Sequence, residues 1–270
     1  MWFQKKEKMK YQLEGKRALV AGSTQGIGWS SALALAEEGV SVTLLARNKE
    51  ALIKCLGELP VVASAQHGFL VADFNDPSAL KEILTEHLQS GLVYHILVNN
   101  TGGPAGGPIV QAGIDEFRNT FNQHLICNHL LTTALVPLMK KEGFGRIINI
   151  ISTSVKQPLK GLGVSNTIRA AVANWSKTLS VELAPFGITV NNVLPGATAT
   201  GRLSGLIEAK SLKTGKSIHE LEQEMLHEIP AGRFAQPWEV AAAVAFLASG
   251  LAGYINGINV PVDGGRTSCL

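Results

Sequence analysis

The sequence predicts an α/β fold of the Rossmann type: a doubly wound parallel sheet of about seven strands with helices on both faces. Three observations predict it. Short apolar runs alternate with longer helical patterns along nearly the whole chain, as in repeated βαβ units. Several runs are apolar throughout, which is expected for strands that are covered on both faces. The first run leads into a glycine-rich turn that opens a helix.

The expected strands are short, apolar and bounded by turn-forming residues. They cover residues 17–21, 41–46, 66–71, 94–98, 145–151, 188–193 and 257–260. The expected helices cover residues 26–38, 49–58, 77–89, 114–142, 163–184, a region within 202–228, and 237–249. Asp76 and Pro77 supply a helix cap followed by proline at the first helical position. Gly39 and Gly143 each follow a helix as C-terminal residues.

Length and composition fit one folded unit with a large core. The chain has 270 residues, 46% of them hydrophobic and 17% charged, and no linker or internal repeat divides it. We expect a flexible N-terminal extension over residues 1–12 and a single Rossmann domain over residues 13–270. The net charge of +3 comes largely from residues 1–10. The rest of the chain therefore lacks the basic field of a protein that binds nucleic acid.

Other features predict a cytoplasmic protein that binds no metal and enters no membrane. Cys55, Cys127 and Cys269 are odd in number and widely spaced, which is typical of a reducing compartment and does not fit a metal site. His129 follows His124 by five positions without an acidic partner at metal-binding spacing. The N-terminus lacks the apolar run of a signal peptide. The longest apolar helical stretch, near residues 240–251, is too short to span a bilayer.

The segment 201–236 is polar and lies between two regular segments. Ile218, Leu221 and Met225 fall on one helical face within it. Because a long insertion beside the carboxyl ends of parallel strands often covers a ligand, we expect a substrate lid here. A surface helix that only covers the sheet edge is the alternative.

The turn after the first strand has the composition of a phosphate-binding loop. Gly22, Gly26 and Gly28 follow the spacing G-x-x-x-G-x-G. Such glycines allow a sharp turn, a close approach of backbone to a diphosphate, and tight packing of the helix on the sheet. The helix N-terminus adds free N–H groups and the positive end of its dipole. The expected contacts are Gly22, Ser23, Thr24, Gln25, Gly26, Ile27 and Gly28. An ordinary strand–helix turn is the alternative.

The end of the second strand favours NADP(H) over NAD(H). A site for NAD usually has an acidic residue here that binds the ribose 2′-hydroxyl. This chain has Arg47 and Asn48 instead, and a guanidinium suits a 2′-phosphate. The alternative is that Arg47 is a solvated charge at the start of a helix.

Further motifs resemble those of the short-chain dehydrogenase/reductase family, from Leu13 to Gly265. Besides the glycine turn, they are VADF at 71–74, NNTG at 99–102, RIINIIS at 146–152, NNVLPG at 191–196, IPAGRF at 229–234 and VDGG at 262–265. The resemblance implies a seven-stranded domain that binds NAD(P) and acts on a small-molecule carbonyl or alcohol. It also implies a homo-oligomer, a dimer or tetramer, which in many members forms through the helices near 114–142 and 163–184.

The same resemblance assigns site residues. It places an aspartate at the adenine, a proline–glycine pair at the nicotinamide, and a basic residue of the catalytic helix at the cofactor ribose. The implied cofactor contacts in this chain are Asp73, Phe74, Asn100, Thr101, Gly102, Arg169, Pro195, Gly196 and Thr198.

The chain departs from the family at the catalytic residues. Counted forward from Ser152, which the resemblance places at the substrate oxygen, the family's Tyr-x-x-x-Lys falls on Ser165 and Arg169. Counted back from Pro137, the family's asparagine falls on His124. A serine hydroxyl is a weaker acid than tyrosine, and a guanidinium holds charge without exchanging a proton near neutral pH. Positions 165 and 169 still share one helical face.

Three functions stay open. The first is carbonyl–alcohol oxidoreduction, in which Ser152 holds the substrate oxygen while Ser165, His124 and water relay the proton. His124 suits this role because an imidazole titrates near neutrality, and a packed helix histidine is the alternative. The second is NADP(H) binding without turnover, as a sensor or scaffold. The third is a structural role in an oligomer.

Two neighbouring features could contribute to a substrate pocket. The glycine- and proline-rich loop 102–108 follows the fourth strand and either shapes the pocket or only turns the chain. Lys156 and Lys160 lie between Ser152 and Ser165. They suit an acidic substrate, or are solvated surface lysines.

Overall fold

The computed structural model describes residues 11–269 and shows one seven-stranded sheet. All neighbouring strands run parallel, in the order β3-β2-β1-β4-β5-β6-β7. The strands are β1 (Arg17–Ala21), β2 (Ser41–Ala46), β3 (Gly68–Val71), β4 (Ile96–Asn99), β5 (Gly145–Ile150), β6 (Ile188–Pro195) and β7 (Asn259–Val262). The predicted doubly wound parallel sheet is confirmed.

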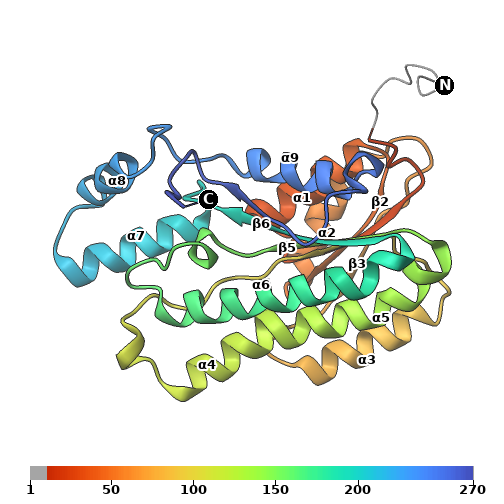
Figure 1. Cartoon of the computed structure of the whole chain (residues 1–270), viewed down its shortest axis with the longest axis horizontal. Coiled ribbons are helices and arrows are strands. Elements are labelled where there is room, and N and C mark those ends of the chain that lie inside the picture. The colour runs from red at the N-terminus through yellow and green to blue at the C-terminus, as the bar shows by residue number, and fades with distance from the viewer. Residues whose placement is uncertain (1–10, 270) are drawn as a thin grey trace.

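Helices cover both faces of the sheet (Figure 1). One face carries α1 (Gly26–Glu37), α2 (Lys49–Glu58) and α9 (Pro237–Ala248). The other carries α3 (Pro77–Leu88), α5 (Cys127–Glu142) and α6 (Gly163–Leu183), with α4 (Ile114–Phe121) leading into α5. Two more helices, α7 (Gly201–Thr214) and α8 (Ile218–His227), extend beyond the carboxyl end of β6.

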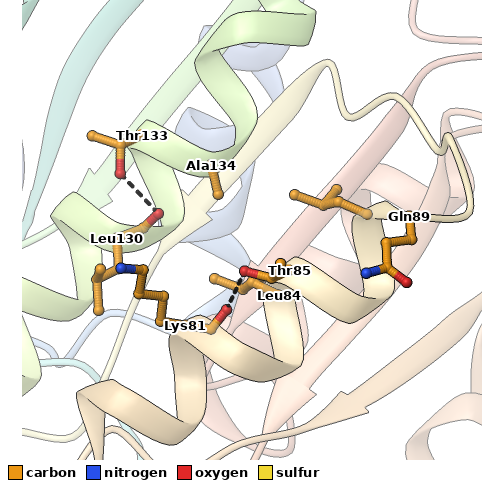
Figure 2. A pocket seen from close by; sticks show the side chains of 8 residues that line it. Lys81, Leu84, Thr85, Gln89, Leu130, Thr133 and Ala134 are labelled. Atoms are coloured by element: carbon orange, nitrogen blue, oxygen red, sulfur yellow. Dashed lines mark hydrogen bonds between the residues drawn. The ribbon is translucent and has the colours of Figure 1, made fainter.

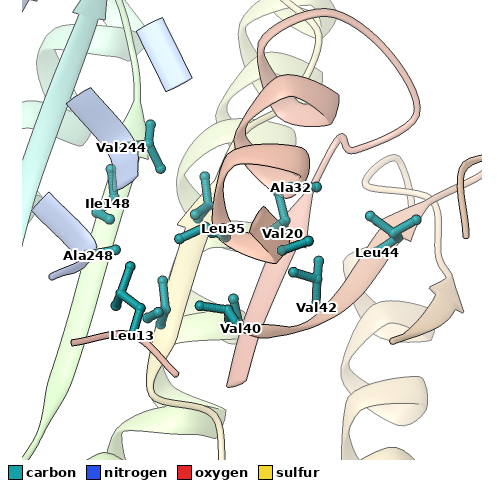
Figure 3. Close-up of a cluster of buried hydrophobic side chains, with 14 of the residues drawn as sticks. Leu13, Val20, Ala32, Leu35, Val40, Val42, Leu44, Ile148, Val244 and Ala248 are labelled. Carbon is teal, nitrogen blue, oxygen red and sulfur yellow. The ribbon is translucent and has the colours of Figure 1, made fainter. Parts of the chain in front are cut away.

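Each inner strand contributes to two cores, because successive side chains of a strand point to opposite faces. In β1, Val20 packs with Leu35 and Val244 in the core under α1 and α9 (Figure 3). Its neighbour Leu19 belongs to the second core, under α3 and α5, together with Leu131. All five side chains are fully buried. This double coverage explains why the strand sequences show no polar alternation.

The order of the strands determines where the sheet can bind a ligand. From β1 the chain winds outward through β2 to β3 and then crosses back to β4 on the other side of β1. The loops after β1 and β4 therefore lead to helices on opposite faces. Doubly wound sheets bind their ligands at this point, outside the carboxyl ends of the strands.

A row of asparagines joins the four strands on the site side of the sheet. Asn99 Nδ2 donates to Asn149 Oδ1 (2.8 Å), Asn149 Nδ2 donates to Asn192 Oδ1 (3.0 Å), and Asn192 Nδ2 donates to Asn259 Oδ1 (2.8 Å). These residues are also register partners in β4, β5, β6 and β7. The amide row therefore fixes the register of the strands whose ends carry the candidate site.

Several element boundaries differ from the sequence prediction. β4 begins at Ile96 rather than at residue 94, because its pairing with β1 starts where Ile96 lies opposite Ala18. β7 begins at Asn259 rather than at residue 257, because Gly257 adopts a left-handed φ of 70°. β7 then continues through Pro261, which an edge strand tolerates because one of its sides needs no N–H donor.

The helix predicted over 114–142 is present over that whole range, but it is not a regular α-helix throughout. The structure divides this stretch into α4, a π-helical segment at Asn122–Ile126, and α5. We call Asn122–Ile126 the π segment. A π turn inserts a residue into the helical repeat and occurs frequently at functional sites. His124 lies within it.

The structure describes the whole predicted lid but only part of the predicted N-terminal extension. Residues 1–10 of the predicted extension lie outside the described residues, whereas Tyr11 packs against the first core. In the predicted lid, Leu203 and Ile207 of α7 pack with Leu221 of α8 in a small core of their own. Ile218 is 46% exposed and takes no part in that core.

Candidate cofactor and active site

The turn after β1 is shaped by glycines that admit no side chain. Gly22 has a left-handed φ of 59°. A Cβ on Gly28 would lie 2.1 Å from the Gly22 carbonyl oxygen, and a Cβ on Gly22 would lie 2.6 Å from Asn100 Nδ2. The same Nδ2 donates to the carbonyls of Ala21 (3.3 Å) and Gly22 (3.2 Å). Asn100 therefore braces the turn from the end of β4.

The N-terminus of α1 keeps its backbone amides available. Gln25 is the N-cap, and its side chain makes no capping hydrogen bond. Ser23 is fully buried, and its Oγ accepts from the Leu45 amide (3.0 Å), so it holds the turn to β2. Ile27 packs against the first core. Free N–H groups at a helix start bind anions, so Ser23 and Ile27 have only backbone groups to offer a phosphate.

Thr200 faces this turn from the other side and was missed by the sequence analysis. A Cβ on Gly26 would lie 3.2 Å from the Thr200 methyl group. Thr200 is the N-cap of α7, and its Oγ1 accepts from the Leu203 amide (3.4 Å). The first turn of α7 thus lies over the candidate phosphate site.

The predicted adenosine-end residues lie beyond β2 and β3. Arg47 and Asn48 are exposed, and Asn48 Oδ1 caps α2 by accepting from the Ala51 amide (2.9 Å). Asp73 is exposed, and its Oδ1 accepts from the Asn75 amide (2.9 Å). The Phe74 side chain is 9% exposed and belongs to the second core. Arg47 and Asp73 can reach a ligand with their side chains, whereas Phe74 offers only its backbone.

The predicted nicotinamide-end residues follow β4 and end β6. Thr101 is half-buried and Gly102 exposed, directly after Asn100. Pro195 is the last residue of β6, and a Cβ on Gly196 would lie 2.7 Å from Asp263 Cα. Thr198 is 5% exposed, and its Oγ1 donates to the Gly196 carbonyl (3.2 Å). The Thr198 hydroxyl therefore stabilises the loop after β6.

The predicted catalytic residues come from three neighbouring elements. Ser152 follows β5, and its Oγ accepts from the Ser154 amide (3.1 Å). Ser165 and Arg169 lie one turn apart on α6, and Arg169 Nη1 donates to the Ile150 carbonyl at the end of β5 (2.7 Å). His124 enters from the π segment, which contacts α6. Arg169 Nε and His124 Nε2 are buried and make no hydrogen bond.

The electrostatics of this group are set by burial and by arginines. Burial lowers the pKa of His124 well below its usual value, and Arg169 and Arg202 lower it further, against a backbone hydrogen bond with Gly102. The expectation that His124 titrates near neutrality is therefore wrong. Burial, and then Arg202, lower the pKa of Arg169 to about 10, so its guanidinium remains charged near neutral pH.

The residues present fit a dinucleotide. The glycine turn leaves no room for side chains, and the amides of α1 lack a side-chain cap. Arg47 lies at the end of β2 without a carboxylate partner among the described ion pairs. The site can therefore hold an anionic, extended ligand across the carboxyl ends of β1, β2 and β4.

Comparison with known proteins decides the family. Residues 21–267 match the family model described as Enoyl-(Acyl carrier protein) reductase. The chain is 33% identical over 263 residues to the NADPH-dependent reductase BacG of Bacillus subtilis, a match that covers 94% of this chain and 99% of that protein. The chain belongs to the short-chain dehydrogenase/reductase family.

Two further members of this family are similar over nearly their whole length. The 3-oxoacyl-(acyl-carrier-protein) reductase FabG of Haemophilus influenzae is 33% identical over 256 residues, 94% of this chain and 98% of that protein. The crystal structure of L-sorbose reductase from Gluconobacter frateurii, complexed with NADPH and L-sorbose, superimposes with a TM-score of 0.89 at 29% identity. That match covers 97% of this chain and 100% of that chain.

A cavity elsewhere on this short-chain dehydrogenase/reductase lacks the groups that catalysis requires. It has a volume of about 450 Å³ and lies between α3 and α5 (Figure 2). Its hydroxyls are engaged by their own helices: Thr85 Oγ1 donates to the Lys81 carbonyl (2.8 Å), and Thr133 Oγ1 to the Leu130 carbonyl (3.2 Å). Lys81 is its one charged residue. This cavity therefore offers fewer polar groups than the strand ends do.

Residues 11–269 contain neither a metal-site arrangement nor a membrane-spanning helix. No group of His, Cys, Asp and Glu side chains in that range has the arrangement of a metal site. No helix there is long and apolar enough to cross a membrane.

Proposed function

We propose that this protein is an NADP(H)-dependent oxidoreductase that interconverts a small-molecule carbonyl and an alcohol through a non-standard proton relay. One observation carries the proposal: the backbone cradle after β1 and the polar side chains of β5, α6 and the π segment gather at the same edge of one sheet. The exposed Arg47 supports NADP(H) over NAD(H). The NADPH-dependent reductase and the NADPH complex among its relatives support the same choice.

The cofactor-binding roles follow from position along that edge. The amides of the turn Gly22–Gly28 hold the diphosphate, Arg47 the 2′-phosphate, and Asp73 the adenine. The segments 100–102 and 195–198 border the nicotinamide, and Arg169 holds its ribose. When bound, NADPH supplies the hydride for reduction.

The proton needs a route that involves no tyrosine. Of the three tyrosines, Tyr11 packs against the first core, Tyr94 is buried against Thr43, and Tyr254 is fully exposed near the C-terminus. Ser152 Oγ accepts from a backbone amide and keeps its own proton, which it can donate to the substrate oxygen. Ser165 and water extend the relay from there. His124 takes part as a neutral imidazole, accepting at one ring nitrogen while the other donates.

NADP(H) binding without turnover is the second candidate, and a specific observation favours it. His124 is 2% exposed and its pKa is strongly lowered, so its imidazolium is scarce near neutral pH. A protein with this site would bind NADPH and act as a sensor or scaffold.

A titration with NADPH and NADH, followed by a panel of carbonyls and alcohols read at the nicotinamide absorbance, tests both candidates. We expect NADPH to bind more tightly than NADH and at least one carbonyl to be reduced. Ser165→Ala and His124→Ala should each lower kcat by about 100-fold, the usual scale for a proton-transfer group. Thr167→Ala is the matched control, because Thr167 is an exposed hydroxyl on the same helix that bonds to the Gly163 carbonyl.

The outcomes separate the candidates. Unchanged turnover in both Ser165→Ala and His124→Ala contradicts the relay. NADPH binding without turnover supports the sensor, and the double variant Ser165→Tyr, Arg169→Lys should then gain reductase activity. Absence of NADPH binding contradicts both candidates.

The same proposal includes a cytoplasmic homo-oligomer, a dimer or tetramer, that binds neither nucleic acid nor membrane. Large apolar side chains on the surface support the oligomer: Val181 on α6 is 68% exposed and Trp238 on α9 is 65% exposed. Light scattering coupled to size-exclusion chromatography would measure the molar mass, and a monomer would contradict this part.

A further inference from the structure

Arg202 links two loops of the candidate site. It lies in the first turn of α7, and its Nη2 donates to the Pro104 carbonyl in the loop after β4. A Cβ on Gly103 would lie 3.0 Å from that Nη2 and 3.4 Å from both Cζ and Nε. The guanidinium therefore packs directly on Gly103, where a side chain would displace it. Partial burial lowers the pKa of this guanidinium, although the residue as a whole is exposed.

Arg169 provides a second guanidinium beside it. Arg169 is 8% exposed, and its burial, and then the charge of Arg202, lower its pKa to about 10. The charges of both arginines also lower the pKa of His124, in addition to the larger effect of its burial. The contacts agree with this placement: His124 has a backbone hydrogen bond with Gly102, Arg202 packs on the neighbouring Gly103, and Arg169 bonds to the carbonyl at the end of β5.

No acidic group among the described residues neutralises this pair. The five ion pairs found in the described chain involve other basic residues: Arg118, Lys210, Lys216, Arg233 and Arg266. A buried cation without a counter-ion is costly. Arg169 Nε and His124 Nε2 also stay without a hydrogen-bond partner. The uncompensated charge and the free Arg169 N–H therefore favour an anion at this place.

We propose that Arg202 forms a subsite for a substrate carboxylate, beside the Arg169 that holds the cofactor ribose, so that the preferred substrates are oxo acids and the corresponding hydroxy acids. This inference rests on the proposed oxidoreductase function and names its substrate class. Reduction adds a hydride to the ketone carbon and a proton to its oxygen, oxidises NADPH to NADP+, and leaves the carboxylate unchanged.

The position of Arg202 favours a substrate carboxylate over the cofactor diphosphate. The diphosphate belongs at the N-terminus of α1, where the amides are free. Arg202 instead bonds to the loop after β4 and acts on Arg169 and His124, which lie beside the proposed reacting carbonyl. A guanidinium also matches the geometry and charge of a carboxylate.

Matched pairs of substrates test the subsite. We would measure kcat/KM with NADPH for α-ketobutyrate and levulinate and for their methyl esters, which keep the ketone but lack the charge. We expect at least one acid to exceed its ester by about 10- to 100-fold, the scale of one charge-assisted hydrogen bond. Arg202→Gln should remove that preference while it leaves the ester rate and the Kd for NADPH within about threefold. Arg202→Lys should keep part of the preference, because it keeps the charge without the bidentate geometry.

Arg118→Gln is the control. It removes one guanidinium from a side chain that is 73% exposed on α4, and it should leave the acid-to-ester ratio unchanged. Calorimetric titration of each acid into the NADP+ complex provides a readout without turnover. Carboxylate binding that weakens about tenfold in Arg202→Gln would support the subsite even if no ketone in the series is reduced.

The outcomes distinguish this inference from the proposed function. Reduction of esters and acids at equal rates leaves the oxidoreductase intact and overturns the subsite. An Arg202→Gln variant that loses NADPH affinity by the same factor as acid turnover would assign the anion site to the cofactor diphosphate, and would also overturn the subsite. Absence of NADPH binding in the wild type would overturn the proposed function itself.

Discussion

The two halves of this molecule differ in how completely their buried polar atoms are hydrogen-bonded. Eight buried side-chain nitrogen or oxygen atoms in the described chain have no hydrogen-bond partner, and all of them lie between Asn99 and Thr189. None lies in the preceding stretch from residue 11 to residue 98, which builds β1 to β3 and most of β4. Native proteins satisfy nearly all such atoms. The first half is therefore a finished scaffold, whereas residues 99–189 keep unused bonding capacity, some of it on His124 and Arg169 at the candidate site.

The difference follows from what each half offers a ligand. In the first half, the glycine turn presents backbone, and side chains such as Ser23 serve only to hold it. In the second half, His124 and Arg169 present side chains with free nitrogen atoms. A backbone site depends on shape and a side-chain site on charge and protonation, so the two halves should respond to different substitutions.

The largest effect is expected from filling the glycine turn. In Gly28→Ala the new Cβ would meet the Gly22 carbonyl oxygen at 2.1 Å, and neither backbone segment can move without moving β1 or α1. We expect a loss of about 3 kcal/mol in the free energy of unfolding and at least a 100-fold loss of NADPH affinity, roughly 2.7 kcal/mol. Urea denaturation and fluorescence titration would measure the two quantities.

Gly57→Ala is the matched control for this prediction. Gly57 lies in α2 with no atom near its missing side chain. Alanine there should stabilise the protein by about 0.5–1 kcal/mol without changing cofactor binding. If Gly28→Ala binds NADPH as well as Gly57→Ala does, the turn is not a shape-dependent site.

A smaller effect is expected from interrupting the asparagine row. Asn149→Ala leaves Asn99 Nδ2 and Asn192 Oδ1 without partners inside the sheet. We expect a loss of about 2 kcal/mol in the free energy of unfolding, from unsatisfied buried groups. Asn259→Ala, at the half-exposed end of the row, should cost about half as much, because water can replace its contact. Equal losses in urea denaturation would show that the row is not a coupled network.

The features that the sequence predicted depend on neighbours along the chain. The apolar strands, the glycine turn and the helix start at Asp76 are local patterns, and the structure contains all of them. The predicted ends of the strands were less accurate, because tertiary contacts determine where a strand begins and ends. β4, for example, begins where Ile96 pairs with Ala18 of β1, which is far away in the sequence.

The features that the sequence missed depend on contacts between distant segments. Arg202 and Pro104 are 98 residues apart, so no local pattern indicates that they bond. The π segment was missed because the apolar spacing over 114–142 also fits one continuous helix. The low pKa of His124 was missed for a related reason: burial and two arginines from other elements cause it.

The smallest effect is expected from the protonation of His124. Burial and the two arginines hold its folded-state pKa below that of the unfolded chain, which is about 6.5. As the pH falls through that value, the unfolded chain binds a proton that the folded chain does not, so stability decreases. The substitution His124→Asn removes this pH-dependent contribution to the free energy of unfolding. The free energy of unfolding of the wild type, minus that of the variant, should therefore fall between pH 7.5 and 5.5, by at most about 1.4 kcal/mol per pH unit. A difference that stays constant over this range would mean that His124 is free to protonate in the folded protein, and would reopen its role as a charged acid in the reacting half.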